Sequence, residues 1–251
     1  ELVPLPVDEQ GIVPDFALPA PRLIYLTPTH QYPTGHTLSL PRRLALVDYA
    51  KRSGSWIIED DYDSEFLYDS RPTPSLQGLD EDSRVIYIGT FSKTLYPSLR
   101  IAYAVLPEAL VRPMVTARSV HDGHVTQLAQ AVTADFMMRG HFATHLRLMR
   151  QLYRSRRDLL LELIERKLPW AKPLSSSGGL QLCVTLPQGT EAHLTRTAGK
   201  HGIATPSLST LYHDTTSNDG WLLGFSALRP GEIEDAVAAL SKLKLKNLAS
   251  T

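Results

Sequence analysis

The sequence has almost no cysteine, no long apolar run and no net charge, and each absence excludes a class of protein. With Cys183 as its one cysteine, the chain can form no internal disulfide, which excludes a disulfide-stabilised secreted domain. No apolar run approaches the ~18–20 residues of a membrane span. Lysine plus arginine number 26, as do aspartate plus glutamate, so the charge does not indicate that this chain binds nucleic acid by itself. We therefore expect a cytoplasmic protein without membrane association.

Apolar residues are plentiful and fall into alternating strand-like and helix-like segments. They make up 43% of the 251 residues, enough for a sizeable core in one or two domains. The segments expected to be ordered are 23–26, 39–54, 56–58, 84–89, 101–106, 107–119, 125–138, 141–168, 179–186, 191–201, 221–225 and 231–244. Their alternation predicts an α/β architecture with a mainly parallel sheet. The expected domain boundary lies near residues 140–150, which gives domains 1–145 and 146–251.

Polar groups of several kinds follow three of the predicted strands, in the loops 27–35, 59–62 and 90–100. The carboxyl ends of parallel strands share one edge, where α/β sheets bind ligands. That edge would hold a lysine, hydroxyls, an arginine, a carboxylate and a phenol. A phosphorylated aromatic aldehyde needs these groups: an amine for a Schiff base, an arginine and hydroxyls for the phosphate, and a carboxylate for a protonated pyridine nitrogen.

The motifs in these loops resemble a known family. Residues 89–93 (GTFSK) with Arg100 are similar to the lysine region of the class I aminotransferases, which are pyridoxal-phosphate enzymes of fold type I. Together with residues 29–35 (THQYPTG) and 59–66 (EDDYDSEF), they resemble more particularly the effector domain of the MocR-family transcriptional regulators, a branch of the GntR family. The resemblance implies a fold type I large domain with a mainly parallel sheet and a smaller α/β C-terminal domain.

Carried over residue by residue, the resemblance implies a site for pyridoxal 5'-phosphate, with Lys93 as the catalytic, Schiff-base lysine. The resemblance implies that Thr90, Ser92 and Arg100 contact the phosphate. It also implies that Asp60 contacts the pyridine nitrogen and that Tyr62 contacts the phenolic oxygen. Asp61 and Asp63 have no assigned task and are expected to be solvated loop charges.

Two positions depart from the aminotransferase pattern. Tyr32 stands where an Asn-Pro-x-Gly loop has its asparagine, so we place Tyr32 at the cofactor, with His30 or Gln31 as alternative partners of the ring oxygen. Leu222 stands where an arginine clamps the substrate carboxylate, and Arg229 has the wrong spacing to replace it. Losing a bidentate clamp costs both orientation and affinity, which counts against ordinary transamination and leaves open whether the ligand is an amino acid.

The resemblance favours an effector-sensing domain over an enzyme. An amine or amino-acid effector, or the cofactor itself, would change the state of the domain, and a DNA-binding winged helix-turn-helix outside this chain would respond. The alternatives are a pyridoxal-phosphate-dependent class I aminotransferase acting on an amino acid, and a structural dimerisation module with a decayed site.

Three further expectations concern the surroundings of the chain. The sequence starts at Glu1 without a methionine, so we expect a piece of a longer protein, with the DNA-binding region, the Gly-rich phosphate loop and the ring-stacking aromatic upstream. A homodimer is expected by resemblance alone. No metal site is expected, because His141 and His145 have helical ligand spacing but no accompanying carboxylate or cysteine cluster.

Overall fold

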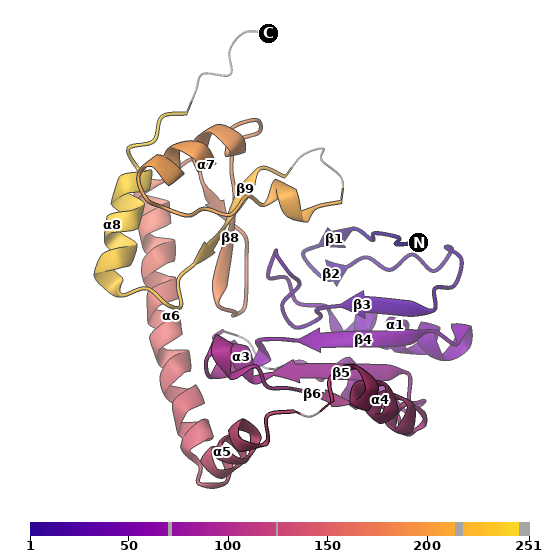
Figure 1. Ribbon diagram of the computed structural model, residues 1–251. Coiled ribbons are helices and arrows are strands. Elements are labelled where there is room, and N and C mark those ends of the chain that lie inside the picture. Colours follow the sequence, from indigo (N-terminus) through magenta and orange to yellow (C-terminus); the bar gives the residue numbers. More distant parts are fainter. Residues whose placement is uncertain (70–71, 124, 214–217, 246–251) are drawn as a thin grey trace. The chain divides into compact units, whose positions relative to one another are not determined.

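The computed structural model describes residues 1–69, 72–123, 125–213 and 218–245 (Figure 1). It divides into two compact units. The first comprises Glu1–Gln31 and His36–Met149, and the second comprises Tyr32–Gly35 and Arg150–Thr251.

The first unit is built on a four-stranded sheet (Figure 1). Its strands lie in the order β3 (Leu23–Leu26), β4 (Trp56–Asp61), β5 (Val85–Thr90) and β6 (Ala102–Val105). The first three are parallel, and β6 is antiparallel to β5. This mixed sheet confirms the α/β prediction. It also means that β3, β4 and β5 end, and β6 begins, at the same edge.

One face of this sheet holds the core of the first unit, because alternate strand residues point toward helix α1 (Leu40–Ser53). The helix follows Ser39, which takes the extended N-cap conformation, and it ends at Gly54 in a left-handed conformation that suits glycine. The core residues on the four sheet strands and α1 are Ile24, Leu26, Leu46, Val47, Tyr49, Ala50, Ile57 and Val85.

A buried arginine on α1 forms hydrogen bonds with several loops of the first unit. Arg43 of α1 donates to the carbonyl oxygens of Pro28, Leu38 and Pro74 at 2.8–3.0 Å. Its guanidinium lies 3.6 Å from the Glu59 carboxylate, and both side chains are buried. Glu59 also accepts the backbone N–H groups of the first turn of α2 (Leu76–Leu79) at 2.9 Å. The ion pair therefore has its hydrogen bonds satisfied, as a buried pair requires.

The second unit is built on a three-stranded antiparallel sheet of β7 (Lys172–Pro173), β8 (Gln181–Thr185) and β9 (Gly220–Gly224). Helices α7 (Glu191–Lys200) and α8 (Pro230–Leu240) belong to this unit. Cys183 is buried, and burial raises the pKa of its thiol to about 12, as expected of an unreactive core thiol. Glu191 accepts hydrogen bonds from the backbone N–H groups of Ser209 and Gly220 at 2.8–3.0 Å.

The remaining elements are short or peripheral, except for α6, whose residues are divided between the two units. They are β1 (Val7–Asp8), β2 (Gly11–Ile12), η1 (Ser64–Phe66), α3 (Phe91–Thr94), η2 (Pro97–Leu99), α4 (Glu108–His121), α5 (Gln127–Met138), α6 (His141–Lys167) and η3 (Ser209–Leu211). No helix in the described part of the chain is both long and apolar enough to cross a membrane.

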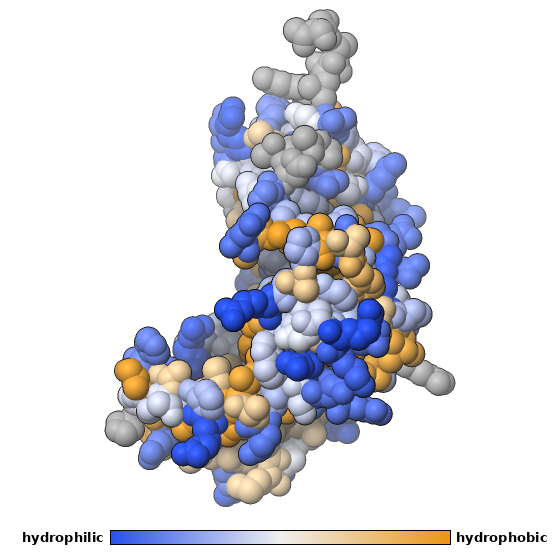
Figure 2. All heavy atoms as spheres, turned by 90° about the vertical axis from the view of Figure 1, so that its right-hand side faces the viewer, coloured by the Kyte–Doolittle hydropathy of each residue, from blue (hydrophilic) through white to orange (hydrophobic). Residues whose placement is uncertain are grey.

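Apolar side chains also reach the surface (Figure 2). In the first unit, those on the sheet and on α4 and α5 include Leu23, Tyr25, Tyr103, Val105, Met114, Val115, Val120, Leu128, Val132, Met137 and Met138. Of these strand residues, Leu23 and Tyr25 lie on the sheet face opposite the core, which is thus partly open, although parallel sheets usually have both faces covered.

Candidate functional site

The candidate site lies at the edge of the first sheet where β3, β4 and β5 end and β6 begins. Register places Asp61 opposite Gly89 and Thr90 opposite Ala102. Six of the seven predicted site residues lie on these strand ends or in the segments that join them, namely Asp60, Tyr62, Thr90, Ser92, Lys93 and Arg100. Tyr32 falls in the short segment that is grouped with the second unit, so it is not placed with the other six.

The segment after β5 forms one turn of helix that presents the lysine. The Thr90 hydroxyl accepts the N–H of Ser92 at 3.1 Å and donates to the carbonyl oxygen of Ile101 at 3.3 Å. Thr90 thereby caps α3, in which the Lys93 side chain is exposed. The sequence did not predict this capping role, which uses the same hydroxyl that the resemblance assigns to the phosphate.

Arg100 lies at the same edge, and its backbone conformation is strained. It joins η2 to β6 with a φ of 54°, in the left-handed region that non-glycine residues seldom adopt. Such strain concentrates at functional sites. Within the described residues, neither Lys93 nor Arg100 has a carboxylate partner, so the edge offers two exposed cations to an anionic ligand.

Asp60 is held by a residue that sequence reasoning missed. The Tyr25 hydroxyl on β3 donates to Oδ2 of Asp60 on β4 at 2.5 Å. Partial burial, followed by the hydrogen bond to the Asp60 carboxylate, raises the pKa of Tyr25 to about 12. The sequence showed Tyr25 only as part of a buried strand. Strand alternation places it on the sheet face opposite the core, where it meets Asp60.

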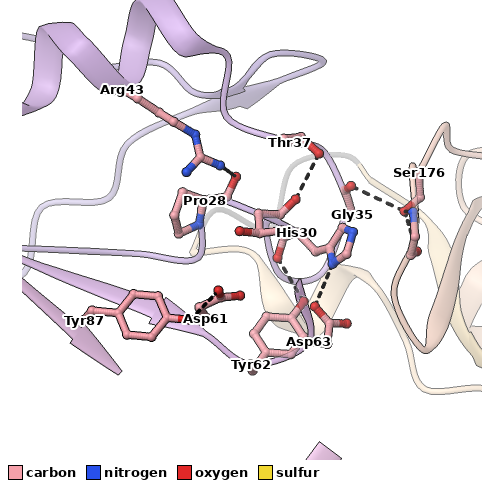
Figure 3. A network of polar contacts seen from close by, with 12 residues as sticks. Pro28, His30, Gly35, Thr37, Arg43, Asp61, Tyr62, Asp63, Tyr87 and Ser176 are labelled. Carbon is pink, nitrogen blue, oxygen red and sulfur yellow. Dashed lines mark hydrogen bonds and ion pairs between the residues drawn. The ribbon is translucent and has the colours of Figure 1, made fainter. Parts of the chain in front are cut away.

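The expectation that the two neighbouring aspartates are solvated loop charges is wrong. Asp61 and Asp63 are 9% and 3% exposed, so they are not solvated loop charges. Strand β4 continues through Asp61 and turns its side chain to the core face, where the Tyr87 hydroxyl donates to Oδ2 of Asp61 at 2.7 Å (Figure 3). Burial, and then Asp61, raises the pKa of Tyr87 far above its usual range.

His30 and Asp63 form a buried pair that joins two loops of the edge (Figure 3). Nδ1 of His30 lies 2.6 Å from Oδ1 of Asp63, and Nε2 of His30 is buried without a hydrogen-bond partner. The Tyr62 hydroxyl donates to the carbonyl oxygen of His30 at 2.9 Å. Two residues that follow β4 are therefore bound to one residue after β3, which fixes where Tyr62 stands.

The loop after β3 is held from its other side as well (Figure 3). The Thr37 hydroxyl donates to the carbonyl oxygen of Thr29 at 2.9 Å, and the N–H of Gln31 donates to the carbonyl oxygen of His36 at 2.8 Å. With Arg43 bound to Pro28, the loop is preorganised by the protein itself.

The second unit holds no cation at the position where an aminotransferase clamp is expected. Leu222 is buried in β9, opposite Cys183, and packs in an apolar cluster with Cys183, Leu208, Leu174 and Tyr212. Arg229 caps α8 and pairs with Glu232 at 2.7 Å. Both observations agree with the departures read from the sequence.

The chemistry of the edge fits a phosphorylated pyridine aldehyde. It combines an exposed amine, a guanidinium, hydroxyls and a half-buried carboxylate whose orientation is set by Tyr25. A planar guanidinium suits a phosphate group, and an ionised carboxylate suits a pyridinium N–H.

The chain matches the family model for class I and II aminotransferases over residues 21–229. It is 39% identical to the probable rhizopine catabolism regulatory protein MocR of Rhizobium meliloti, covering 96% of this chain and 49% of that protein. It is 32% identical to the HTH-type pyridoxine biosynthesis transcriptional regulator PdxR of Corynebacterium glutamicum, covering 95% and 53%. The chain thus spans about half the length of the curated relatives it matches.

Solved structures agree with these relatives. The multiple substrate aminotransferase of Thermococcus profundus matches with a TM-score of 0.88 and 28% identity, covering 96% of this chain and 63% of that one. The α-aminoadipate aminotransferase LysN of Thermus thermophilus matches with a TM-score of 0.85 and 30% identity, covering 94% and 63%. The fold type I prediction and the resemblance to MocR regulators are confirmed.

Proposed function

Because the chain belongs to the class I and II aminotransferase family, we propose that it is the ligand-sensing domain of a pyridoxal-phosphate-dependent, DNA-binding transcriptional regulator of the MocR type. One contrast carries the proposal. The edge that would hold the cofactor keeps its amine, guanidinium and carboxylate, whereas a buried leucine, Leu222, stands in place of the carboxylate clamp. The regulators among the relatives support the same conclusion.

Each residue of the edge has a role in this proposal. Pyridoxal 5'-phosphate, when bound, supplies an aldehyde conjugated to an electron-withdrawing ring. Lys93 would supply the amine for the aldehyde, and Arg100 with the hydroxyls of Thr90 and Ser92 would hold the phosphate. Asp60 faces the ring nitrogen.

Two tyrosines complete the proposed set of contacts. Tyr62 contacts the ring oxygen, and Tyr32 is proposed as a cofactor contact on the resemblance alone. The O–H of Tyr62 is already donated to the His30 carbonyl, so Tyr62 meets that oxygen as an acceptor unless its hydroxyl turns.

The ligand and partners belong to the proposal too. The effector is an amine, an amino acid or pyridoxal phosphate alone, and the relative named for pyridoxine biosynthesis regulation supports the last of these. DNA is bound by a region outside this chain, the protein is a cytoplasmic homodimer, and residues 1–145 and 146–251 form the large and small domains.

A genuine aminotransferase is the second candidate, supported by the solved structures. It would use the same lysine to move the substrate's α-proton. The buried Leu222 counts against it, because a leucine side chain has no charge with which to bind a substrate carboxylate.

The intact protein distinguishes these functions. Wild type loaded with pyridoxal phosphate should show the Schiff-base absorbance, and borohydride should fix the cofactor on the peptide that contains Lys93. Lys93→Ala should lose both signals, whereas Lys51→Ala, an exposed lysine of α1, should keep them. Cofactor fixed on another lysine would refute the assignment. Steady transamination of common amino acids at the median enzyme rate of ~10 per second would restore the enzyme.

A further inference from the structure

We propose that Tyr25 is a positioning residue that holds the Asp60 carboxylate in place for the ring nitrogen of the cofactor. The inference rests on the proposed function and adds a residue that neither the motifs nor the comparisons assign. It comes from the hydrogen bond between the two side chains, which join β3 to β4 on the more open face of the sheet.

The sheet register makes this contact possible. Tyr25 lies directly opposite Ile58, and Asp60 is two residues further along β4, so both side chains lie on the same face. A tyrosine side chain is long enough to reach this diagonal neighbour. The 2.5 Å separation is typical of an O–H group bound to a carboxylate.

Asp60 needs such a partner because nothing else in the described chain fixes its carboxylate. Its neighbours Glu59 and Asp61 point to the core face and are each bound there by other groups. Asp60 is half-buried on the open face, where a free side chain would sample several rotamers. The bond from Tyr25 occupies Oδ2 and leaves Oδ1 to accept a ring N–H.

The phenol is suited to this task over the whole physiological range. With its pKa raised to about 12, Tyr25 remains a neutral hydrogen-bond donor at physiological pH and places no negative charge beside the Asp60 carboxylate. Because the phenol keeps its O–H proton, the hydrogen bond from Tyr25 to Oδ2 of Asp60 persists over this range.

The strand β4 also offers a matched control. Tyr87 donates to Oδ2 of Asp61 at 2.7 Å, so the same two residue types make the same bond on the core face of the same strand. Tyr25→Phe and Tyr87→Phe each remove one phenolic O–H from one aspartate. Only the first of these aspartates faces the proposed ring nitrogen.

The first experiment measures cofactor affinity in the intact protein by titrating pyridoxal phosphate into the unliganded form. We expect Tyr25→Phe to raise the dissociation constant roughly three- to tenfold, the effect of one charge-assisted hydrogen bond at a partly exposed carboxylate. Tyr87→Phe should leave the constant unchanged at a temperature where both variants are folded. An unchanged affinity in Tyr25→Phe would overturn the inference.

A double-mutant cycle shows whether Tyr25 acts through Asp60. In an Asp60→Asn background, Tyr25→Phe should change the affinity by less than about a factor of two. A ring analogue with CH in place of the pyridine nitrogen should bind wild type and Tyr25→Phe equally. Additive effects in the cycle would mean that Tyr25 acts elsewhere. If Lys93 does not bind the cofactor, the proposed function itself fails, and the borohydride experiment reveals that separately.

Discussion

Replacing Asp63 by alanine should destabilise the first unit far more than the loss of a surface charge would. The buried carboxylate is the partner of Nδ1 of His30, and Nε2 of His30 already has no partner. Removing Asp63 would leave both ring nitrogens of a 2%-exposed histidine unsatisfied. An orphaned buried polar group costs about 1–3 kcal/mol, so we expect a loss of about 2–3 kcal/mol.

Thermal unfolding of the intact protein measures this loss. At ~2–4 °C per kcal/mol for a chain of this size, the midpoint for the first unit should fall by roughly 4–12 °C. Asp48→Ala is the matched control, because Asp48 forms an exposed i,i+4 pair with Arg52 on α1 and should cost under about 0.5 kcal/mol. Asp63→Asn should lie between the two, since an amide oxygen can still accept from Nδ1. If Asp63→Ala is no less stable than Asp48→Ala, the argument from burial fails.

Three further predictions test other features. First, because the folded-state pKa of Tyr25 is raised to about 12 from an ordinary value of about 10, its stabilising contribution is complete below about pH 10. That contribution is lost as the pH rises through about 12. Between about pH 10 and pH 12, the free energy of unfolding should therefore fall less for Tyr25→Phe than for wild type. Second, Gly220→Ala should destabilise the second unit by about 1–3 kcal/mol in denaturant titrations, because a Cβ there would lie 2.4 Å from the carbonyl oxygen of Val184. Gly224→Ala on the same strand meets nothing within 4 Å and should be tolerated, and equal losses would contradict this. Third, Leu222→Arg should lower the unfolding midpoint of the second unit by several degrees without producing transaminase activity, since it places a charge in an apolar cluster; a stable, active variant would show that only the clamp was missing.

Much of the candidate site was predictable from the order of motifs. Residues 59–62 and 90–100 each lie at the end of a strand that begins with apolar residues, and the carboxyl ends of parallel strands meet at one edge whatever their exact register. The antiparallel direction of β6 was not predictable, because an apolar run of four residues has the same pattern in either direction. The α/β prediction needed only the alternation of segments.

Burial of individual polar residues was not predictable in the same way. Asp63 lies in a run of acidic residues that has the composition of a solvated loop, and only the path of the chain after β4 turns it toward His30. Tyr25 was hidden for a different reason. Its partner is 35 residues away, and the contact depends on the alignment of two strands, which no local pattern encodes.

The acidic run Glu59, Asp60 and Asp61 makes strand β4 intolerant of changes in length. The three carboxylates alternate between the two faces of the sheet, and each has a different partner: the first turn of α2, Tyr25 and Tyr87. A single-residue deletion earlier in the strand would move every one of them to the opposite face. It would turn the carboxylate that faces the proposed ring nitrogen into the core and bring a core carboxylate out. Evolutionary insertions and deletions should therefore be confined to segments outside the strand, such as the loop at residues 80–84, where chain length changes without reversing the faces.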